Sequence, residues 1–297
     1  MAVTFLTPEQ KSFYQENGYL IIPNIITDNQ ISLLKTQIAQ ILKNTPPEQI
    51  QSVFATGTDQ KKINDKYFLS SADDIKVFME NQKFDLVSFL MKQNFKNEDN
   101  VTINLNLNVN KIGHALHKLD PVFSEFTHNN VFKQISHDIG VDDPVIPQSM
   151  YIFKSPGAGG IVEPHQDSTF LYTEPLSCHA FWIPLSDVNA DNGCLWCIPG
   201  SHTNPLVYRF KLDLANKSTY FEPSINDDLT KDIWLEKDYV PIVASKGSLV
   251  LLHGSIVHKS GVNNSTIPRN VYTFHIVDAN AKWDNHNWLQ LQYFVKL

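Results

Sequence analysis

Hydrophobic residues in the first part of the chain recur at the three- and four-residue spacing of an amphipathic helix. After Thr27 the residues at this spacing are Ile31, Leu34, Ile38 and Leu42. Thr27 and Gln30 form a capping pair at the start of this helix, and Thr7-Pro8-Glu9-Gln10 starts an earlier helix that Gly18 ends. Residues 19–23 predict a short strand, and residues 121–140 a further helical stretch. The spacing therefore predicts a mostly helical layer over residues 1–143.

After Pro144 the chain consists of short runs rich in β-branched and aromatic residues, broken by Pro, Gly and Asn. The clearest runs are residues 148–153, 178–185, 241–252 and 269–277. Residues 101–109 also alternate apolar with polar positions and predict an earlier strand. We predict a mainly β protein with flanking helices, whose core over residues 144–297 is a double-stranded β-helix, that is, a cupin-like jelly roll. The whole chain is expected to form one domain.

Composition and charge narrow the classes of function. The 297 residues include 42% hydrophobic ones, which is enough for a substantial core, and the net charge of −7 argues against a nucleic-acid partner. Three cysteines, an odd number, predict a reducing compartment rather than a disulfide framework. Without an apolar span or a leader, we expect a cytoplasmic monomer with no membrane partner. The C-terminal Val295-Lys296-Leu297 is a near miss for a peroxisomal signal.

Candidate chemistry lies in three places in the β-rich part. His165 and Asp167 flank Gln166, and residues two apart in a strand project to the same face, so the imidazole and the carboxylate would point together. His258 follows an apolar run and lies at a predicted strand end. Two imidazoles and one carboxylate form the facial triad that binds Fe(II) and leaves positions open for other ligands. Taken alone, a His-x-Asp tripeptide is more often only solvated.

Arg269 opens the strand that ends near residue 277. Its planar guanidinium could hold the distal carboxylate of a dicarboxylate co-substrate through two parallel hydrogen bonds. A surface ion pair is the simpler interpretation of an isolated arginine.

Other polar residues leave more than one interpretation open. Cys194 and Cys197 are three residues apart in a predicted strand and so face opposite sides, which argues against a zinc or redox pair. His202 follows a Pro-Gly turn and is expected to fix that loop by a hydrogen bond, with metal ligation as the alternative. Two interpretations of His275 are open: it either lines the site or packs against its neighbours without contacting the site. The polar residues 44–64 are either a linker or a lid over the site.

Three motifs together resemble the phytanoyl-CoA dioxygenase family. They are His165-Gln166-Asp167, the stretch from Asn192-Gly193 to Pro199-Gly200-Ser201-His202, and the stretch from His258 through Asn263 to Arg269. The resemblance extends from the N-terminal helix to the last strand. It implies a jelly-roll oxygenase in which His165, Asp167 and His258 bind Fe(II) and Arg269 anchors 2-oxoglutarate.

The same resemblance implies further site residues and co-substrates. Lys111, Met150 and Trp182 would line the 2-oxoglutarate pocket, although a lysine is ordinarily solvated and the other two are ordinary core residues. O2 would be the second co-substrate, and ascorbate is a candidate reductant. Related halogenases lack the carboxylate, so Asp167 favours hydroxylation.

We expect oxidative decarboxylation of 2-oxoglutarate to succinate and CO2, coupled to hydroxylation of a small organic molecule. Phytanoyl-CoA is not favoured as that molecule, because Arg209 and Arg269 are the only arginines and the lysines are scattered, whereas CoA phosphates call for a basic cluster. Two alternatives use the same residues. One is a binding protein that senses metal or 2-oxoglutarate without turnover, and the other is a zinc hydrolase.

Overall fold

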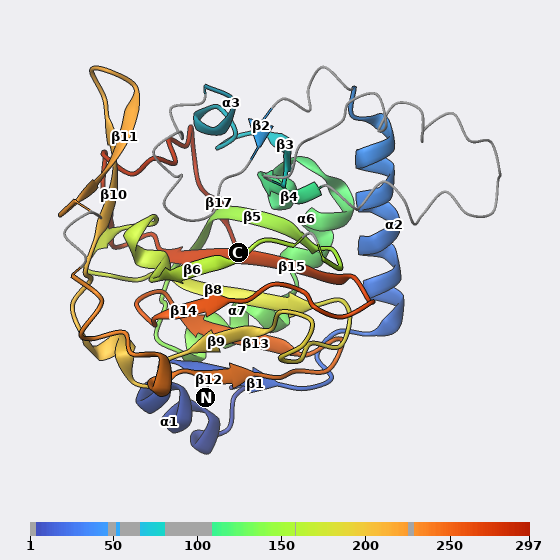
Figure 1. Ribbon diagram of the computed structural model, residues 1–297, viewed down its shortest axis with the longest axis horizontal. Coiled ribbons are helices and arrows are strands. Elements are labelled where there is room, and N and C mark those ends of the chain that lie inside the picture. The colour runs from blue at the N-terminus through green and yellow to red at the C-terminus, as the bar shows by residue number, and fades with distance from the viewer. Residues whose placement is uncertain (1–3, 47–51, 54–65, 81–108, 158, 225–228) are drawn as a thin grey trace.

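The computed structural model describes residues 4–46, 52–53, 66–80, 109–157, 159–224 and 229–297 (Figure 1). Within these residues a four-stranded antiparallel sheet faces a larger, mostly antiparallel sheet, and helices cover the outer face of the larger one. The predicted fold class is confirmed: the protein is mainly β, with a jelly-roll core and flanking helices. In the described part of the chain, no helix is long and apolar enough to cross a bilayer.

The large sheet has the strand order β1-β13-β8-β15-β5-β4-β3-β2, and β17 pairs with β5 beside this path. Its strands are β1 (Tyr19–Ile22), β2 (Ser52–Val53), β3 (Ile75–Met79), β4 (Val109–His114), β5 (Pro144–Lys154), β8 (His179–Pro184), β13 (Leu249–His253), β15 (Arg269–Asp278) and β17 (Val295–Lys296). The small sheet has the order β12-β9-β14-β6. Its strands are β6 (Val162–His165), β9 (Leu195–Cys197), β12 (Val240–Ile242) and β14 (His258–Ser260).

Two further pairs of strands, six α-helices and three short 3-10 helices (Asp167–Thr169, Ser201–Thr203 and Glu236–Asp238) complete the described elements. The strand pairs are β10 (Arg209–Asp213) with β11 (Ser218–Glu222), and β7 (Thr173–Glu174) with β16 (Lys282–Trp283). The helices are α1 (Pro8–Asn17), α2 (Asp28–Asn44), α3 (Lys66–Leu69), α5 (Leu116–Leu119), α6 (Pro121–Thr127) and α7 (Asn130–Asp138). Figure 1 shows α2 along one side of the large sheet, α6 and α7 behind it, and the β10–β11 hairpin projecting from the opposite side.

The large sheet is buried on both faces, which is why its strands are apolar at consecutive positions. In β8, Phe181 and Ile183 pack with the helices, whereas Ala180 and Trp182 face the small sheet. A strand covered on one side only would alternate apolar with polar residues. The large sheet thus has one hydrophobic core on each face, one against the helical layer and the other against the small sheet.

The predicted helix ends agree with the structure. Thr7 with Gln10, and Thr27 with Gln30, form reciprocal capping boxes at the starts of α1 and α2, and Gly18 ends α1 in the left-handed conformation. The stretch predicted over residues 121–140 is two helices, because Asn129 caps a new helix after α6.

Several predicted boundaries need correction. The first 143 residues are not only a helical layer, because β1, β3 and β4 join the large sheet. The run 241–252 is two strands, β12 and β13, separated by a turn at Gly247, where φ is +79°. Of residues 101–109 only Val109 lies in the described part of the chain, and most of residues 44–64 lie outside it.

Candidate metal centre

The two predicted histidine ligands lie opposite each other on neighbouring strands of the small sheet. β6 ends at His165, β14 begins at His258, and the antiparallel register pairs these two residues directly. Their ring centroids are 4.2 Å apart. Residues separated by 93 positions in the sequence are therefore brought together by one strand pair.

Backbone carbonyls orient both imidazoles. His165 Nδ1 donates to the carbonyl of Glu163 at 2.8 Å, and His258 Nδ1 donates to the carbonyl of Ile256 at 3.1 Å. With the proton on Nδ1, each Nε2 keeps its lone pair, and such a second hydrogen bond is the usual means of fixing a ligand imidazole. The two Nε2 atoms lie 3.5 and 3.7 Å from the same oxygen, Oδ1 of Asp167.

Asp167 is not in a strand as predicted but begins a 3-10 helix, Asp167–Thr169. Its carboxylate still shares a side with His165 because Gln166 between them is extended, with φ −120° and ψ 128°. Gln166 points away, as expected, and is buried. Its amide donates to the carbonyl of Ser255 at 2.8 Å, and its Oε1 accepts from the N–H of Val207 at 3.2 Å.

His275 holds the other oxygen of Asp167. Its Nε2 lies 3.2 Å from Asp167 Oδ2, and its Nδ1 lies 3.2 Å from the side-chain nitrogen of Gln148. The amide nitrogen of Gln148 can only donate, so Nδ1 of His275 accepts and Nε2 donates to the carboxylate. This resolves the open prediction for His275: it lines the site and positions a candidate ligand.

The donor set fits a divalent metal. Among the described residues, His165, Asp167 and His258 form the one group of at least three His, Cys, Asp or Glu whose ligand atoms all lie within 4.8 Å of one another. Burial alone would raise the pKa of Asp167, but His258, His275 and His165 hold that pKa well below its usual value. Burial and the neighbouring His165 lower the pKa of His258 to about 4, which keeps this imidazole neutral. Burial would lower the pKa of His165, but its hydrogen bond with Asp167 and the charge of that carboxylate raise it. Two imidazoles and a carboxylate are ligands that suit Fe(II) or zinc.

Arg269 lies in the interior and not on the surface. It is 2% exposed, its Nη2 donates to the carbonyl of Gly193 at 2.7 Å and to Ser260 Oγ at 3.2 Å, and its guanidinium lies 5.4 Å from the ring of Trp182. Its Nε is buried without a hydrogen-bond partner among the described residues. A buried guanidinium with an unsatisfied N–H is suited to an incoming carboxylate. The surface ion pair considered above is therefore wrong.

Ser260 connects Arg269 to the candidate metal ligands. It lies two residues after His258 on the same strand, a distance of about 7 Å at the usual rise per residue. Lys154 Nζ donates to Ser260 Oγ at 2.6 Å and to the carbonyls of Gly160 and Gly261 at 2.9 and 2.5 Å. Burial and the neighbouring Arg269 lower the pKa of Lys154 to about 6.

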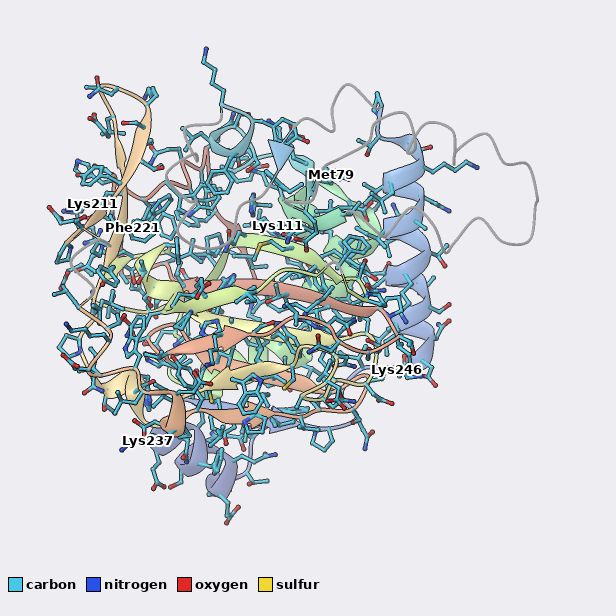
Figure 2. All side chains as sticks on the ribbon, viewed as in Figure 1. Met79, Lys111, Lys211, Phe221, Lys237 and Lys246 are labelled. Carbon is cyan, nitrogen blue, oxygen red and sulfur yellow. The ribbon has the colours of Figure 1, made fainter. Side chains whose placement is uncertain are left out.

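The three residues implied by the family resemblance also face this region. Lys111 of β4 is 8% exposed and lies over the rings of Phe68 and Phe78, and burial lowers its pKa to about 7. Figure 2 shows it beside β4 and β5. Met150 and Trp182 both pair with Thr273 from opposite sides of β15. Together with His165, Asp167, His258 and Arg269, these residues line one cavity of about 560 Å³.

Two other candidates lie away from this cavity. Cys194 and Cys197 are buried free thiols in the core between the sheets, and burial raises the pKa of Cys197 to about 12. His202 donates from Nε2 to the carbonyl of Gln15 at 3.1 Å, so it fixes its loop against the end of α1.

The sequence interpretation missed Ser260, Lys154 and Gln148. For Ser260 a signal was present, since it lies two positions after His258 and would share its face. Lys154 and Gln148 carry no such signal, because their neighbours Arg269 and His275 are on β15, which is far away in the sequence.

Comparison with known proteins provides independent information. Residues 14–271 match the model of the family described as Phytanoyl-CoA dioxygenase (PhyH). A phytanoyl-CoA dioxygenase of Arabidopsis thaliana is 39% identical over 96% of this chain and 94% of its own length. Phytanoyl-CoA dioxygenase domain-containing protein 1 of Danio rerio is 37% identical over 96% of this chain and 95% of its own length.

Solved structures resemble the fold. The non-heme alpha-ketoglutarate-dependent carbocyclase SnoK from nogalamycin biosynthesis superposes with a TM-score of 0.64 at 18% identity, covering 94% of this chain and 87% of that one. EctD from S. alaskensis, solved with bound Fe, has a TM-score of 0.64 at 14% identity, covering 96% of this chain and 81% of that one. At such identities the likeness concerns the fold.

Proposed function

This chain belongs to the phytanoyl-CoA dioxygenase family, and on that premise we propose that it is an Fe(II)- and 2-oxoglutarate-dependent dioxygenase that hydroxylates a small organic molecule. His165, Asp167 and His258 would hold the iron. Arg269, together with Ser260 and Trp182, would hold the distal carboxylate of 2-oxoglutarate, with Lys111 and Met150 lining the same pocket.

The observation that carries the proposal is the presence in one cavity of a set of metal-binding side chains and a buried guanidinium. At one place the Nε2 atoms of His165 and His258 converge on Asp167 Oδ1 at 3.5 and 3.7 Å. At the other, the Nε of the buried Arg269 has no hydrogen-bond partner in the described part of the chain. His258 and Ser260 are two residues apart on one strand, and Ser260 contacts Arg269, so the two groups are separated by roughly the length of a short dicarboxylate. A zinc hydrolase would have no use for the second group.

Iron with 2-oxoglutarate and O2 supplies the oxidising chemistry, releasing succinate and CO2 as a substrate C–H bond is hydroxylated. The chain's own residues provide position and environment. Carbonyls of residues 163 and 256 keep both imidazoles in the ligand tautomer, and His275 keeps the Asp167 carboxylate from rotating. Apolar and aromatic side chains also line the cavity next to the ligands.

The test is succinate formation. Protein loaded anaerobically with Fe(II) and 2-oxoglutarate and then exposed to air should release succinate in an iron-dependent manner. Asp167→Ala should abolish both the release and high-affinity metal binding, because it removes one of three protein ligands. Asp191→Ala, which alters an exposed aspartate, serves as the matched control and should behave as wild type. Equal succinate from wild type and Asp167→Ala would refute the proposal.

A further inference from the structure

Four of the aromatic side chains that line the cavity form a connected group beside the metal ligands. Phe170 follows the 3-10 helix that begins at Asp167, and Tyr208, Phe210 and Phe221 come from the β10–β11 hairpin and the segment before it. We call these four residues the aromatic lobe. Figure 2 shows Phe221 on the hairpin near Lys211, at the side of the molecule opposite α2.

Ring contacts connect the aromatic lobe to the metal centre. The ring of Phe170 lies 6.0 Å from His165, 5.4 Å from Phe210 and 6.2 Å from Phe221. Phe210 and Phe221 are 4.9 Å apart and pair directly across the hairpin. A molecule lying against these rings would therefore reach from the hairpin to a candidate iron ligand.

The aromatic lobe and Arg269 lie toward opposite ends of β15. Arg269 begins this strand, and the segment after its other end contacts the hairpin through the ion pair of Asp284 with Arg209 at 2.9 Å. His275, near the middle of β15, contacts Asp167. If the co-substrate occupies the Arg269 end, the aromatic lobe remains available for the primary substrate.

Hydrogen bonds and an ion pair also hold the β10–β11 hairpin in place next to the metal ligands. Gln166, between His165 and Asp167, accepts a hydrogen bond from the N–H of Val207, just before Tyr208. Arg209 is held by Asp284 and lies over the ring of Tyr172 at 3.3 Å. These contacts preorganise the aromatic lobe, since its base is tied to the same tripeptide that supplies two ligands.

The charges near the aromatic lobe do not suit a phosphate ester. Arg209 is paired with Asp284, and Lys211 forms an ion pair with Glu222. Deeper in the cavity, Lys154 is held by three oxygens. Glu163 is exposed where β6 leads to His165. Within the described residues Arg209 and Lys211 of the hairpin are thus paired, and Lys217, exposed in its turn, is the one hairpin cation without an ion pair. The phosphates of a CoA thioester call for several available cations.

We propose that the aromatic lobe is the primary substrate site, and that the substrate is an uncharged molecule carrying a flat apolar ring system, not an acyl-CoA thioester. This inference rests on the proposed function, because it assigns the substrate of the same iron centre. A ring placed among four tilted and edge-on rings buries its faces and gains favourable aromatic contacts. An unbranched aliphatic chain would gain the burial alone.

The experiment measures binding without turnover. Protein loaded with redox-inert Ni(II) and 2-oxoglutarate is titrated calorimetrically with 2-naphthol, 1-octanol and octanoyl-CoA. We expect 2-naphthol to bind most tightly and octanoyl-CoA least. Phe221→Ala should weaken 2-naphthol by about three- to tenfold, the range for losing one aromatic contact. Tyr220→Ala removes the neighbouring ring, which is 43% exposed, and should leave the affinity unchanged.

Phe221→Leu separates ring recognition from apolar volume. It should retain the affinity for 1-octanol and lose affinity for 2-naphthol, and it provides a second variant should the alanine variant unfold. Tightest binding of octanoyl-CoA, no binding of 2-naphthol at millimolar concentration, or equal 2-naphthol affinity in wild type and both Phe221 variants would overturn the inference. Because nickel replaces iron, these results are independent of whether succinate is formed.

Discussion

Asp167 uses its two carboxylate oxygens for different purposes. Oδ1 faces the Nε2 atoms of His165 and His258, whereas Oδ2 accepts a hydrogen bond from His275, which Gln148 orients in turn. A carboxylate ligand with one oxygen held in this way loses less rotational freedom when a metal binds. His275 is therefore a positioning residue in the proposed centre.

We expect His275→Ala to weaken metal binding by about 10- to 100-fold, the usual effect of removing an outer-shell partner. Titration with Co(II), followed by its visible absorption, gives the affinity and shows a change of coordination directly. His275→Asn, which can still donate, should recover part of the affinity. His286→Ala removes a half-exposed imidazole that pairs with Asp284, and it should have no effect. An unchanged Co(II) affinity in His275→Ala would show that the residue only packs.

Asp138 anchors the N-terminal segment to the end of α7. It accepts hydrogen bonds from the backbone N–H groups of Phe5 and Leu6 at 2.7 Å and from Lys11 at 2.6 Å. Burial alone would raise the pKa of Asp138, but these donors outweigh it and hold the pKa below the usual 3.8. The folded state thus binds the proton more weakly than the unfolded chain, so this carboxylate stabilises the fold above the unfolded pKa.

The stabilisation by Asp138 should be complete at neutral pH and disappear as the pH falls through the folded pKa, below 3.8. Asp138→Asn is expected to lower the free energy of unfolding by about 2 kcal/mol at pH 7, as charge-assisted hydrogen bonds are lost. Urea unfolding between pH 7 and pH 3 should show the two proteins converging at the acid end. Asp142→Asn, at an exposed position, is the control. A difference independent of pH would mean that the charge of Asp138 is irrelevant.

At the scale of elements, Gly18 at the end of α1 is constrained in two ways. One constraint comes from the helix that it ends, and the other comes from a residue that is distant in the sequence. Gly18 takes φ +78°, which favours glycine, and this much follows from its position after a helix. The structure adds that a Cβ here would lie 2.4 Å from Nδ1 of His202. His202 also donates to the carbonyl of Gln15, so the Pro-Gly turn before it packs directly on α1.

Alanine substitutions at two glycines distinguish the cost of backbone strain from the cost of the contact with His202. Gly140→Ala, at φ +92° with open space around it, should cost about 1 kcal/mol of backbone strain alone. Gly18→Ala should cost clearly more, about 2 to 4 kcal/mol, because the methyl group also displaces His202. Equilibrium urea unfolding of both variants gives the comparison. Equal losses would indicate that His202 moves aside without cost.

At the scale of the whole molecule, the proposed ligands should stabilise the fold by mass action. Ni(II) and then 2-oxoglutarate should each raise the thermal midpoint, and at 100 times its Kd a ligand adds about 2.7 kcal/mol. Arg269→Lys should keep the nickel shift and lose most of the 2-oxoglutarate shift, since an ammonium cannot replace the planar fork. Arg209→Lys, at a partly exposed ion pair, is the matched control.

A 2-oxoglutarate shift that is the same in Arg269→Lys and wild type would contradict the assigned anchor. The thermal shift alone does not distinguish the enzyme from a sensor. Both predict stabilisation, but only the enzyme releases succinate once iron replaces nickel and air is admitted. The stability measurement therefore tests the site, and the succinate measurement tests the chemistry.

Local features of the chain determined much of the fold. The capping pairs at Thr7 and Thr27 and the stripe from Ile31 to Leu42 define α1 and α2, because helix ends and faces depend on neighbours within a few residues. The runs after Pro144 define the β-rich core for the same reason. Extended Gln166 likewise keeps His165 and Asp167 on one side, although Asp167 lies outside the strand.

Only the tertiary structure decided which distant residues meet. Strand pairing places His258 opposite His165, His275 beside Gln148, and Arg269 beside Lys154, and the sheet order that does so depends on the packing of the whole core. The aromatic lobe arises in the same way, from a hairpin folding back onto the segment after Asp167. The sequence by itself thus indicated the proposed type of chemistry, because the candidate ligands carry their own local signals. The shape of the proposed substrate site could be seen only in the tertiary structure. Sequence periodicity predicts which face of an element is apolar, but it does not predict which other element packs against that face.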